Sequence, residues 1–182
     1  MLAVSIDDTV MRVDMMARIA DEGRSSMSAK GEVVDEAEIS PVKARREGSS
    51  GYAYLRLLFD PETVGSANAV LAIVTIPPGQ PEPMLPHAHF EYDESEYVVS
   101  GKGYLLMGPS RDKLQRYELK PGKAFFVPAS YPHTVHNTGD EDVKIVFSFY
   151  PGWVKGRPLR LIMTELTDVV SVEGHKDAKR SA

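Results

Sequence analysis

The chain has 182 residues, which is the size of one domain and enough to bury a hydrophobic core without disulfides or a structural metal. Hydrophobic residues make up 42% and charged residues 26%, close to the averages of globular proteins, so the composition argues against a chain that is disordered or membrane-embedded throughout. The net charge of −5 argues against nucleic acid as the main partner, and the lack of cysteine excludes disulfides, thiolate metal ligands and a cysteine nucleophile.

The N-terminus lacks the features of an export signal. Residues 1–6 are followed at once by Asp7 and Asp8, with no basic segment, no long apolar run and no small-residue cleavage site. The longest apolar stretches, such as residues 69–76, are far shorter than the roughly 20 residues of a membrane-spanning helix. We therefore expect a cytoplasmic protein with no membrane partner.

Residues 8–21 have apolar positions at helical spacing, behind Asp8 as a candidate N-cap and ahead of Gly23, which predicts one amphipathic helix. Residues 24–51 are polar and mixed in charge, which predicts a loop or a loosely attached arm. The sequence thus divides into an N-terminal helix and polar arm (1–51), a strand-rich domain (52–165) and a polar C-terminal tail (166–182).

The strand-rich domain consists of short runs of β-branched and aromatic residues separated by proline and glycine. Many short strands with turns between them are typical of an antiparallel sandwich or barrel, so the predicted fold class is all-β. The predicted strands cover residues 52–59, 67–76, 94–99, 103–107, 114–119, 124–127, 134–137, 143–150 and 159–163.

The candidate functional residues are histidines and a glutamate within this domain. His87 and His89 are two residues apart, so on an extended strand both imidazoles point to the same face. Glu94 begins the next predicted strand, and His133 follows a turn-like segment, 128–132, at the start of another. Three imidazoles and one carboxylate suit a divalent Fe, Mn, Ni, Co or Zn ion and leave one or two coordination positions open.

The spacing of these residues follows a known motif. The form G-x5-H-x-H-x3,4-E-x6-G is matched by His87, His89, Glu94 and Gly101, while its leading glycine has only Gly79, two residues too early.

A second motif, G-x5-P-x-G-x2-H-x3-N, is matched at every spacing by Gly122, Pro128, His133 and Asn137, with Ser130 in place of its inner glycine. Together the two motifs resemble those of the cupin superfamily of single-domain, metal-binding proteins with an RmlC-like jelly roll. The resemblance implies a double-stranded β-helix barrel of six to eight strands at residues 52–165. It also implies that His87, His89, Glu94 and His133 are the metal ligands.

Other polar residues near the motifs have two interpretations each. Glu96 shares strand parity with Glu94, so it is either a catalytic carboxylate inside the barrel, acting as proton acceptor, or part of a salt bridge at the rim. His136 is three residues from His133 and is expected on the opposite face, and His175 is expected to be solvated. Arg56 and Lys144 either clamp an anionic substrate or reach the surface.

The aromatic residues of the predicted strands are first expected in the barrel core, and one or two of them are candidates to line a substrate pocket. They are Tyr97, Tyr104, Phe125, Phe147, Phe149 and Tyr150.

The resemblance leaves three functions open. The first is a dioxygenase that binds a small oxygenated organic substrate, with Glu94 and Glu96 as catalytic carboxylates. The second is an isomerase similar to the cupin-type glucose-6-phosphate isomerases, which have a comparable Gly139-Asp140-Glu141 and Tyr150-Pro151 but a Thr-x-Gly where this chain has Met84-Leu85-Pro86. The third is a cupin that only binds a small ligand.

The expected cofactor is one divalent transition metal ion, with iron favoured and Ni, Mn, Zn and Co as alternatives. The expected partners are a small-molecule substrate and, by analogy with cupin barrels that pair through sheet faces or N-terminal strands, a second copy in a homodimer.

Overall fold

The computed structural model describes residues 29–46, 48–66, 69–89 and 92–150, and the backbone of strands at 153–154, 157–158 and 169–173. The predicted helix at 8–21, the predicted strand at 159–163 and His175 lie outside these residues. No helix in the described part of the chain is long and apolar enough to cross a membrane.

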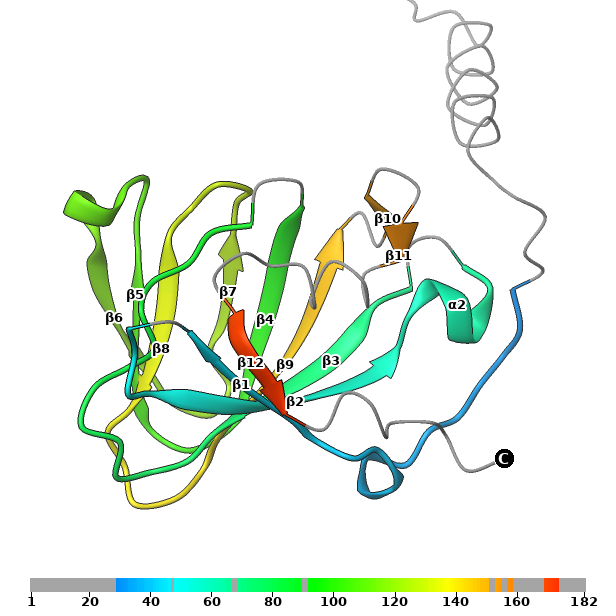
Figure 1. The fold of residues 1–182 in the computed structure, drawn as a ribbon, viewed down its shortest axis with the longest axis horizontal. Coiled ribbons are helices and arrows are strands. Elements are labelled where there is room, and N and C mark those ends of the chain that lie inside the picture. The colour runs from blue at the N-terminus through cyan, green and yellow to red at the C-terminus, as the bar shows by residue number, and fades with distance from the viewer. Residues whose placement is uncertain are drawn as a thin grey trace, which may run out of the picture.

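Strands make up most of the regular secondary structure of the described residues, which confirms the all-β fold class (Figure 1). The helical elements are η1 (Glu36–Glu38), α2 (Pro61–Val64) and η2 (Arg111–Lys113). The strands are β1 (Val42–Arg46), β2 (Tyr52–Phe59), β3 (Leu71–Ile76), β4 (Asp93–Ser100), β5 (Gly103–Met107), β6 (Gln115–Leu119), β7 (Ala124–Val127), β8 (His133–Asn137), β9 (Val143–Tyr150), β10 (Trp153–Val154), β11 (Arg157–Pro158) and β12 (Val169–Glu173).

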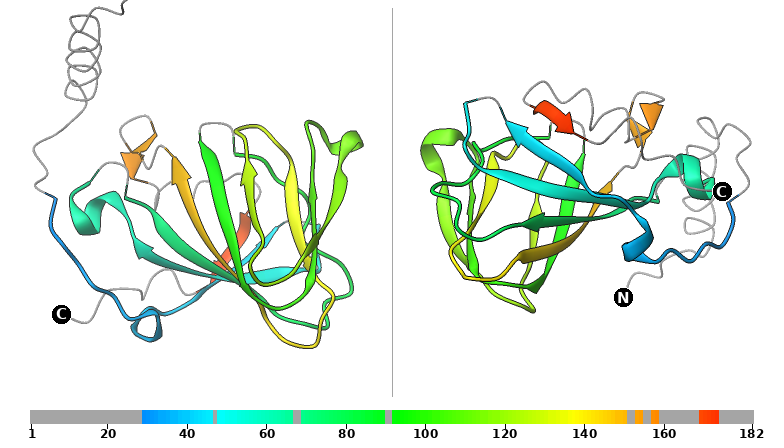
Figure 2. Two further views of the ribbon diagram at one scale, coloured as in Figure 1. Left: turned by 180° about the vertical axis from the view of Figure 1, so that it is seen from behind. Right: turned by 60° about the horizontal axis from the view of Figure 1, so that its bottom comes forward.

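The strands form two main antiparallel sheets that curve around a common interior. The larger sheet has the order β12-β1-β2-β3-β9-β4-β7, the smaller has the order β6-β5-β8, and β10 and β11 form a separate pair. Figure 2, in the view with the bottom turned forward, looks into the barrel that the two main sheets enclose. Non-consecutive neighbours such as β4 and β9 are typical of a jelly roll rather than of a meander.

The strand predictions for 52–59, 103–107, 124–127 and 143–150 agree with the structure residue for residue. The polar arm is different, because Val42–Arg46 forms β1, which pairs with β2 through Ala44 and Ala53. Ala44 is buried and Arg45 is exposed, but one such pair is too short to stand out from a charged segment. β1 is a strand because it pairs with the backbone of β2, and the residues of β1 alone do not predict this pairing.

Two hydrophobic clusters fill the barrel. One contains Val70, Ala72, Tyr92, Phe147 and Phe149. The other contains Ala53, Ile76, Val98, Leu105, Leu119, Val143 and Ile145. Their members on β4 and β9 alternate with exposed or half-buried residues, as expected for a sheet with one face toward the core.

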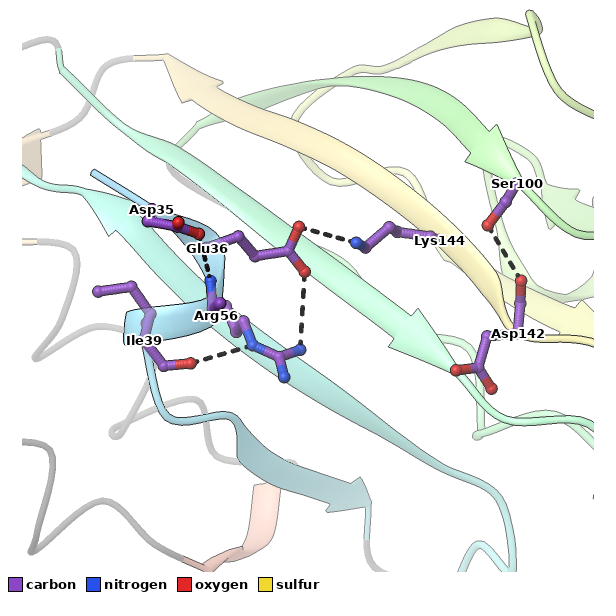
Figure 3. Close-up of polar contacts among 8 residues, drawn as sticks. Asp35, Glu36, Ile39, Arg56, Ser100, Asp142 and Lys144 are labelled. Atoms are coloured by element: carbon purple, nitrogen blue, oxygen red, sulfur yellow. Dashed lines mark hydrogen bonds and ion pairs between the residues drawn. The ribbon is translucent and has the colours of Figure 1, made fainter. Parts of the chain in front are cut away.

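Arg56 and Lys144 lie on the outer face of the larger sheet, where both contact Glu36 of η1 (Figure 3). The Lys144 Nζ atom is 2.7 Å from Glu36 Oε2, and an Arg56 guanidinium nitrogen is 3.9 Å from Glu36 Oε1. Arg56 also donates from Nε to the carbonyl oxygen of Ile39 at 3.0 Å. These two cations therefore hold residues 36–39 against the sheet, and the hypothesis that they clamp an anionic substrate is not supported.

Candidate metal centre

His87 and His89 reach the interior from an irregular segment rather than from a regular strand. His87 makes one isolated antiparallel bridge with His133, with backbone N–H···O distances of 3.0 and 2.8 Å. The two-residue spacing predicts that both imidazoles face the same way, and their ring centroids lie only 4.8 Å apart. One nitrogen atom each of His87, His89 and His133 lie within 4.8 Å of one another.

Glu94 and His133 come from opposite sheets and meet inside the barrel. Glu94 is on β4 of the larger sheet, and His133 is the first residue of β8 in the smaller one. The Glu94 Oε2 atom is 3.2 Å from His133 Nε2 and 3.3 Å from His89 Nε2. All three side chains are buried, so the structure brings the four predicted ligands into one cluster between the sheets.

The spacing of these atoms fits one bound metal ion. Two ligand atoms at about 2.1 Å from an ion are separated by about 3.0 Å at a right angle and by about 3.4 Å at the tetrahedral angle. The separations of 3.2 and 3.3 Å from Glu94 Oε2 fall between these values. Within the described part of the chain, Glu94 Oε2 is buried and receives no hydrogen bond of good geometry, which is expected where several lone pairs point at a common ion.

The imidazole of His133 is oriented for ligation through Nε2. Its Nδ1 atom lies 3.0 Å from the carbonyl oxygen of Tyr131. A carbonyl oxygen only accepts hydrogen bonds, so Nδ1 carries the proton and donates it. In the neutral ring the lone pair of Nε2 then faces Glu94 and is available to a divalent ion.

The two carboxyl groups of β4 have opposite pKa shifts. Burial raises the pKa of Glu94, but the adjacent imidazoles of His133 and His89 outweigh burial and lower the pKa below its ordinary value. Burial raises the pKa of Glu96 well above its ordinary value, and the negative charge of Glu94 raises it further. The pKa shifts thus favour the ionised form of Glu94, as expected of a ligand, and the protonated form of Glu96.

Glu96 lies inside the barrel rather than at the rim. It is 7% exposed, and no ion pair involves it among the described residues. Its neighbours across the sheet are Phe147 of β9 and Phe125 of β7. A carboxylate oxygen of Glu96 is within 4.8 Å of ligand atoms of Glu94 and His133, so of the two interpretations the structure favours a carboxylate at the site.

Tyr92, which the sequence motifs do not include, packs against one of the candidate ligands. The Tyr92 hydroxyl is 3.0 Å from His89 Nδ1, and the two rings stack at 25° with centroids 4.7 Å apart. Tyr92 precedes Glu94 by two residues and Glu96 by four, so the shared parity of these three residues is a signal that could have identified it.

His136 is not in the cluster, as its strand parity predicts. It is half-buried and stacks on Tyr104, whose hydroxyl is 3.4 Å from His136 Nδ1. Burial lowers the pKa of His136, and the nearby Arg116 guanidinium lowers it further. The expectation that Tyr97 and Tyr150 are core residues is wrong, because they are 51% and 67% exposed.

Parity explains these two exposed tyrosines. Glu94, Glu96 and Val98 of β4 face inward, which turns Tyr97 outward, and Phe147 and Phe149 of β9 face inward, which turns Tyr150 outward.

The loop before His133 keeps the glycine-like conformation of the motif although Ser130 replaces the glycine. Ser130 has φ of 72°, in the left-handed region, and its N–H donates to the carbonyl oxygen of His89. The adjacent Ala129 N–H donates to Asp93 Oδ1 at 2.8 Å, which ties the loop to β4. The backbone of this loop therefore links two of the candidate ligands, His89 and His133.

Substitution Ser130→Gly is expected to stabilise the protein. A non-glycine residue in the left-handed region costs about 1–2 kcal/mol, and the greater freedom of glycine in the unfolded chain offsets part of that gain. We expect the free energy of unfolding to rise by about 0.5–1 kcal/mol, measured by urea denaturation. Ser110→Gly, at a residue with φ of −157°, is the control and is expected to give no gain. A destabilised Ser130→Gly variant would contradict this account of the loop.

Comparison with known proteins agrees with this geometry. The family model described as the cupin domain matches residues 72–149, which include all four candidate ligands. Among curated proteins, the polyketide synthase CurC of Streptomyces cyaneus is 29% identical over 119 residues, covering 65% of this chain and 69% of that protein. The glucose-6-phosphate isomerase of Thermococcus onnurineus is 33% identical over 67 residues, covering 36% of this chain and 35% of that protein.

A solved structure shares the same fold. The polyketide cyclase RemF from Streptomyces resistomycificus aligns with a TM-score of 0.55 at 23% identity, covering 66% of this chain and 79% of that protein. Two sheets closed into a jelly roll, two motifs in the expected order and a His/Glu cluster between the sheets agree with the family match. Residues 72–149 of this chain thus match the cupin domain in sequence and have its jelly-roll fold.

Proposed function

We propose that this protein is a mononuclear metal-dependent enzyme in which His87, His89, Glu94 and His133 bind the ion. The observation that carries the proposal is the buried Glu94 carboxylate oxygen, 3.2 and 3.3 Å from two imidazole nitrogens that belong to other segments of the barrel. A buried carboxylate oxygen such as Glu94 Oε2, which receives no hydrogen bond among the described residues, is costly to bury, and a bound ion would satisfy it. Iron is the favoured ion, because three imidazoles and one carboxylate suit it and leave positions for substrate.

The ion would supply Lewis acidity toward an oxygen atom of the substrate and, if redox-active, access to dioxygen chemistry. The chain's own residues supply the rest. An ionised Glu94 would offset the positive charge of the ion. Glu96, whose carboxylate lies beside Glu94 and His133, would give a proton when it is protonated and take one back once it has ionised. Tyr92, Phe147 and Phe149 pack next to the cluster and exclude water from that side.

We propose further that the substrate is a small oxygenated organic compound of the catechol, flavonol or β-diketone type and that the reaction is a dioxygenation. Such compounds offer two adjacent oxygen atoms to a metal with open positions. The polyketide name of the relative CurC supports this substrate class, since polyketides are rich in β-dicarbonyl and phenolic groups.

The test is oxygen uptake by the iron-loaded protein with a panel of catechols, flavonols and β-diketones. We expect at least one compound to be consumed together with dioxygen and to be stable under nitrogen. Loading with zinc, which has no redox chemistry, is the matched control and is expected to give no oxygen uptake. Consumption at the same rate under nitrogen would contradict the dioxygenase.

A non-oxidative proton transfer, as in an isomerase, is the second candidate, and the buried carboxyl group of Glu96 beside the cluster favours it. A sugar phosphate is disfavoured as its substrate. The cations Arg56 and Lys144 contact Glu36 on the outer face of the sheet and do not face the cluster. Turnover of fructose 6-phosphate under nitrogen would support the isomerase.

Substitution Glu96→Gln tests the carboxyl group under either chemistry. Glutamine keeps the shape but cannot transfer the proton, so we expect turnover to fall by about 10²–10⁴-fold while the bound metal is retained. The control is Glu118→Gln, at an exposed residue of β6, which is expected to leave turnover unchanged. Unchanged turnover in Glu96→Gln would exclude Glu96 from proton transfer.

A further inference from the structure

The hydroxyl group of Tyr92 contacts His89, one of the candidate ligands. The Tyr92 hydroxyl oxygen is 3.0 Å from His89 Nδ1, and Tyr92 is 3% exposed. We infer that Tyr92 is a positioning residue, which holds His89 in the tautomer and orientation that metal binding through Nε2 requires. This inference rests on the ligand set of the proposed function.

The hydroxyl contact selects the tautomer. His89 turns its Nε2 atom toward Glu94 Oε2, at 3.3 Å, and therefore toward the proposed ion. An imidazole that offers the lone pair of Nε2 to a metal carries its proton on Nδ1. The oxygen of Tyr92 accepts that proton's hydrogen bond, which stabilises the metal-binding tautomer and makes Nε2 a better donor.

The packing around the pair fixes the orientation of the ring. The His89 and Tyr92 rings stack at 25° with a centroid distance of 4.7 Å. Phe149 contacts both edge-on, at 5.1 Å from His89 and 4.4 Å from Tyr92. Rotation of the His89 ring would have to displace two buried aromatic rings, which a closely packed interior resists.

The hydrogen-bond partner of His89 can be removed by a substitution, because it is the side-chain hydroxyl of Tyr92. The corresponding partner of His133 is a backbone carbonyl, that of Tyr131, which no substitution deletes. The partner of His89 is a side-chain hydroxyl, and phenylalanine removes this oxygen while keeping the ring and its stacking. Because Tyr92 lies two residues before Glu94, it also couples the position of His89 to the strand that bears the carboxylate ligand.

The test compares Tyr92→Phe with the parent protein, both stripped of metal and titrated with cobalt(II), whose visible absorption reports ligand geometry. We expect the dissociation constant for cobalt to rise by about 10–100-fold and the visible bands to change. The matched control is Tyr104→Phe. Tyr104 also stacks on a histidine, His136, at 21° and 5.2 Å with its hydroxyl 3.4 Å from Nδ1, but outside the cluster. This control is expected to bind cobalt like the parent.

A second measurement needs no metal. In the metal-free protein we expect Tyr92→Phe to shift the ¹⁵N resonances of the His89 ring and to leave those of the His133 ring in place. Cobalt binding by Tyr92→Phe with the affinity and spectrum of the parent would overturn the inference. A parent protein that binds no cobalt would refute the proposed function instead, and the His89 resonances would then decide by themselves whether Tyr92 sets the tautomer.

Discussion

Replacement of His133 by alanine is expected to remove the bound metal from the purified protein. His133 Nε2 is 3.2 Å from Glu94 Oε2, and its ring centroid is 4.1 Å from that of His87, so its imidazole lies at the centre of the cluster. Loss of a residue that only supports a ligand already costs about 10–100-fold in metal affinity, and loss of the ligand itself should cost more than about 100-fold. Elemental analysis after dialysis measures this effect directly.

The fold should survive this substitution, because His133 joins its neighbours through the backbone. Its N–H and C=O groups pair with those of His87, and these groups remain in alanine. His136→Ala is the matched control, since His136 lies on the same strand but turns away from the cluster, and it should keep its metal. A full equivalent of metal in His133→Ala, with strand-like far-UV circular dichroism, would refute the ligand assignment.

Replacement of Gly101 by alanine is expected to destabilise the whole barrel. Gly101 has φ of 82°, which a side chain tolerates poorly. An added Cβ would lie 2.5 Å from the carbonyl oxygen of Asp142 and 2.6 Å from the Cα atom of Val143, and neither backbone atom can move without disturbing β9. We expect a loss of about 3 kcal/mol or more in the free energy of unfolding, from left-handed strain plus overpacking.

Gly122→Ala separates the two causes. Gly122 also has positive φ, 87°, but an added Cβ would meet no atom within 4 Å. This variant should therefore lose only the conformational term, about 1–2 kcal/mol. Urea denaturation of both variants gives the difference, and equal losses would show that the close approach of β9 to Gly101 does not contribute.

The sequence predicts much of the fold because most strands are recognisable locally. The run from Val143 to Tyr150 is rich in β-branched and aromatic residues and is bounded by turn residues, and it forms β9 with those bounds. β1 was not predicted, because its pairing with β2 comes from backbone groups that carry no residue-specific signal. The single-turn helix α2 is stabilised by a local interaction, because Asp60 and Thr63 form a capping box at its N-terminus.

The sequence predicts which residues form the site better than it predicts the backbone conformation that positions them. The spacing of His87, His89, Glu94 and His133 singled out four residues whose side chains the structure brings together. It also placed His136 outside this cluster, since parity along a strand is a local property. The extended strand expected at 87–89 is instead a single bridge between His87 and His133, because His89 accepts a hydrogen bond from the loop residue Ser130 and not from a further strand residue.

By itself, the sequence predicted most strands of the barrel, their order and the four candidate ligands, because strand alternation and residue spacing are encoded locally. Only the tertiary structure decided which face of each strand became the interior, and it placed Glu96 inside and Tyr97 and Tyr150 outside. It also decided that Tyr92 contacts His89 and that Glu94 meets His133 from the opposite sheet. These contacts depend on how the two sheets pack against each other. Residue spacing along the chain does not give the distances across the barrel that this packing sets.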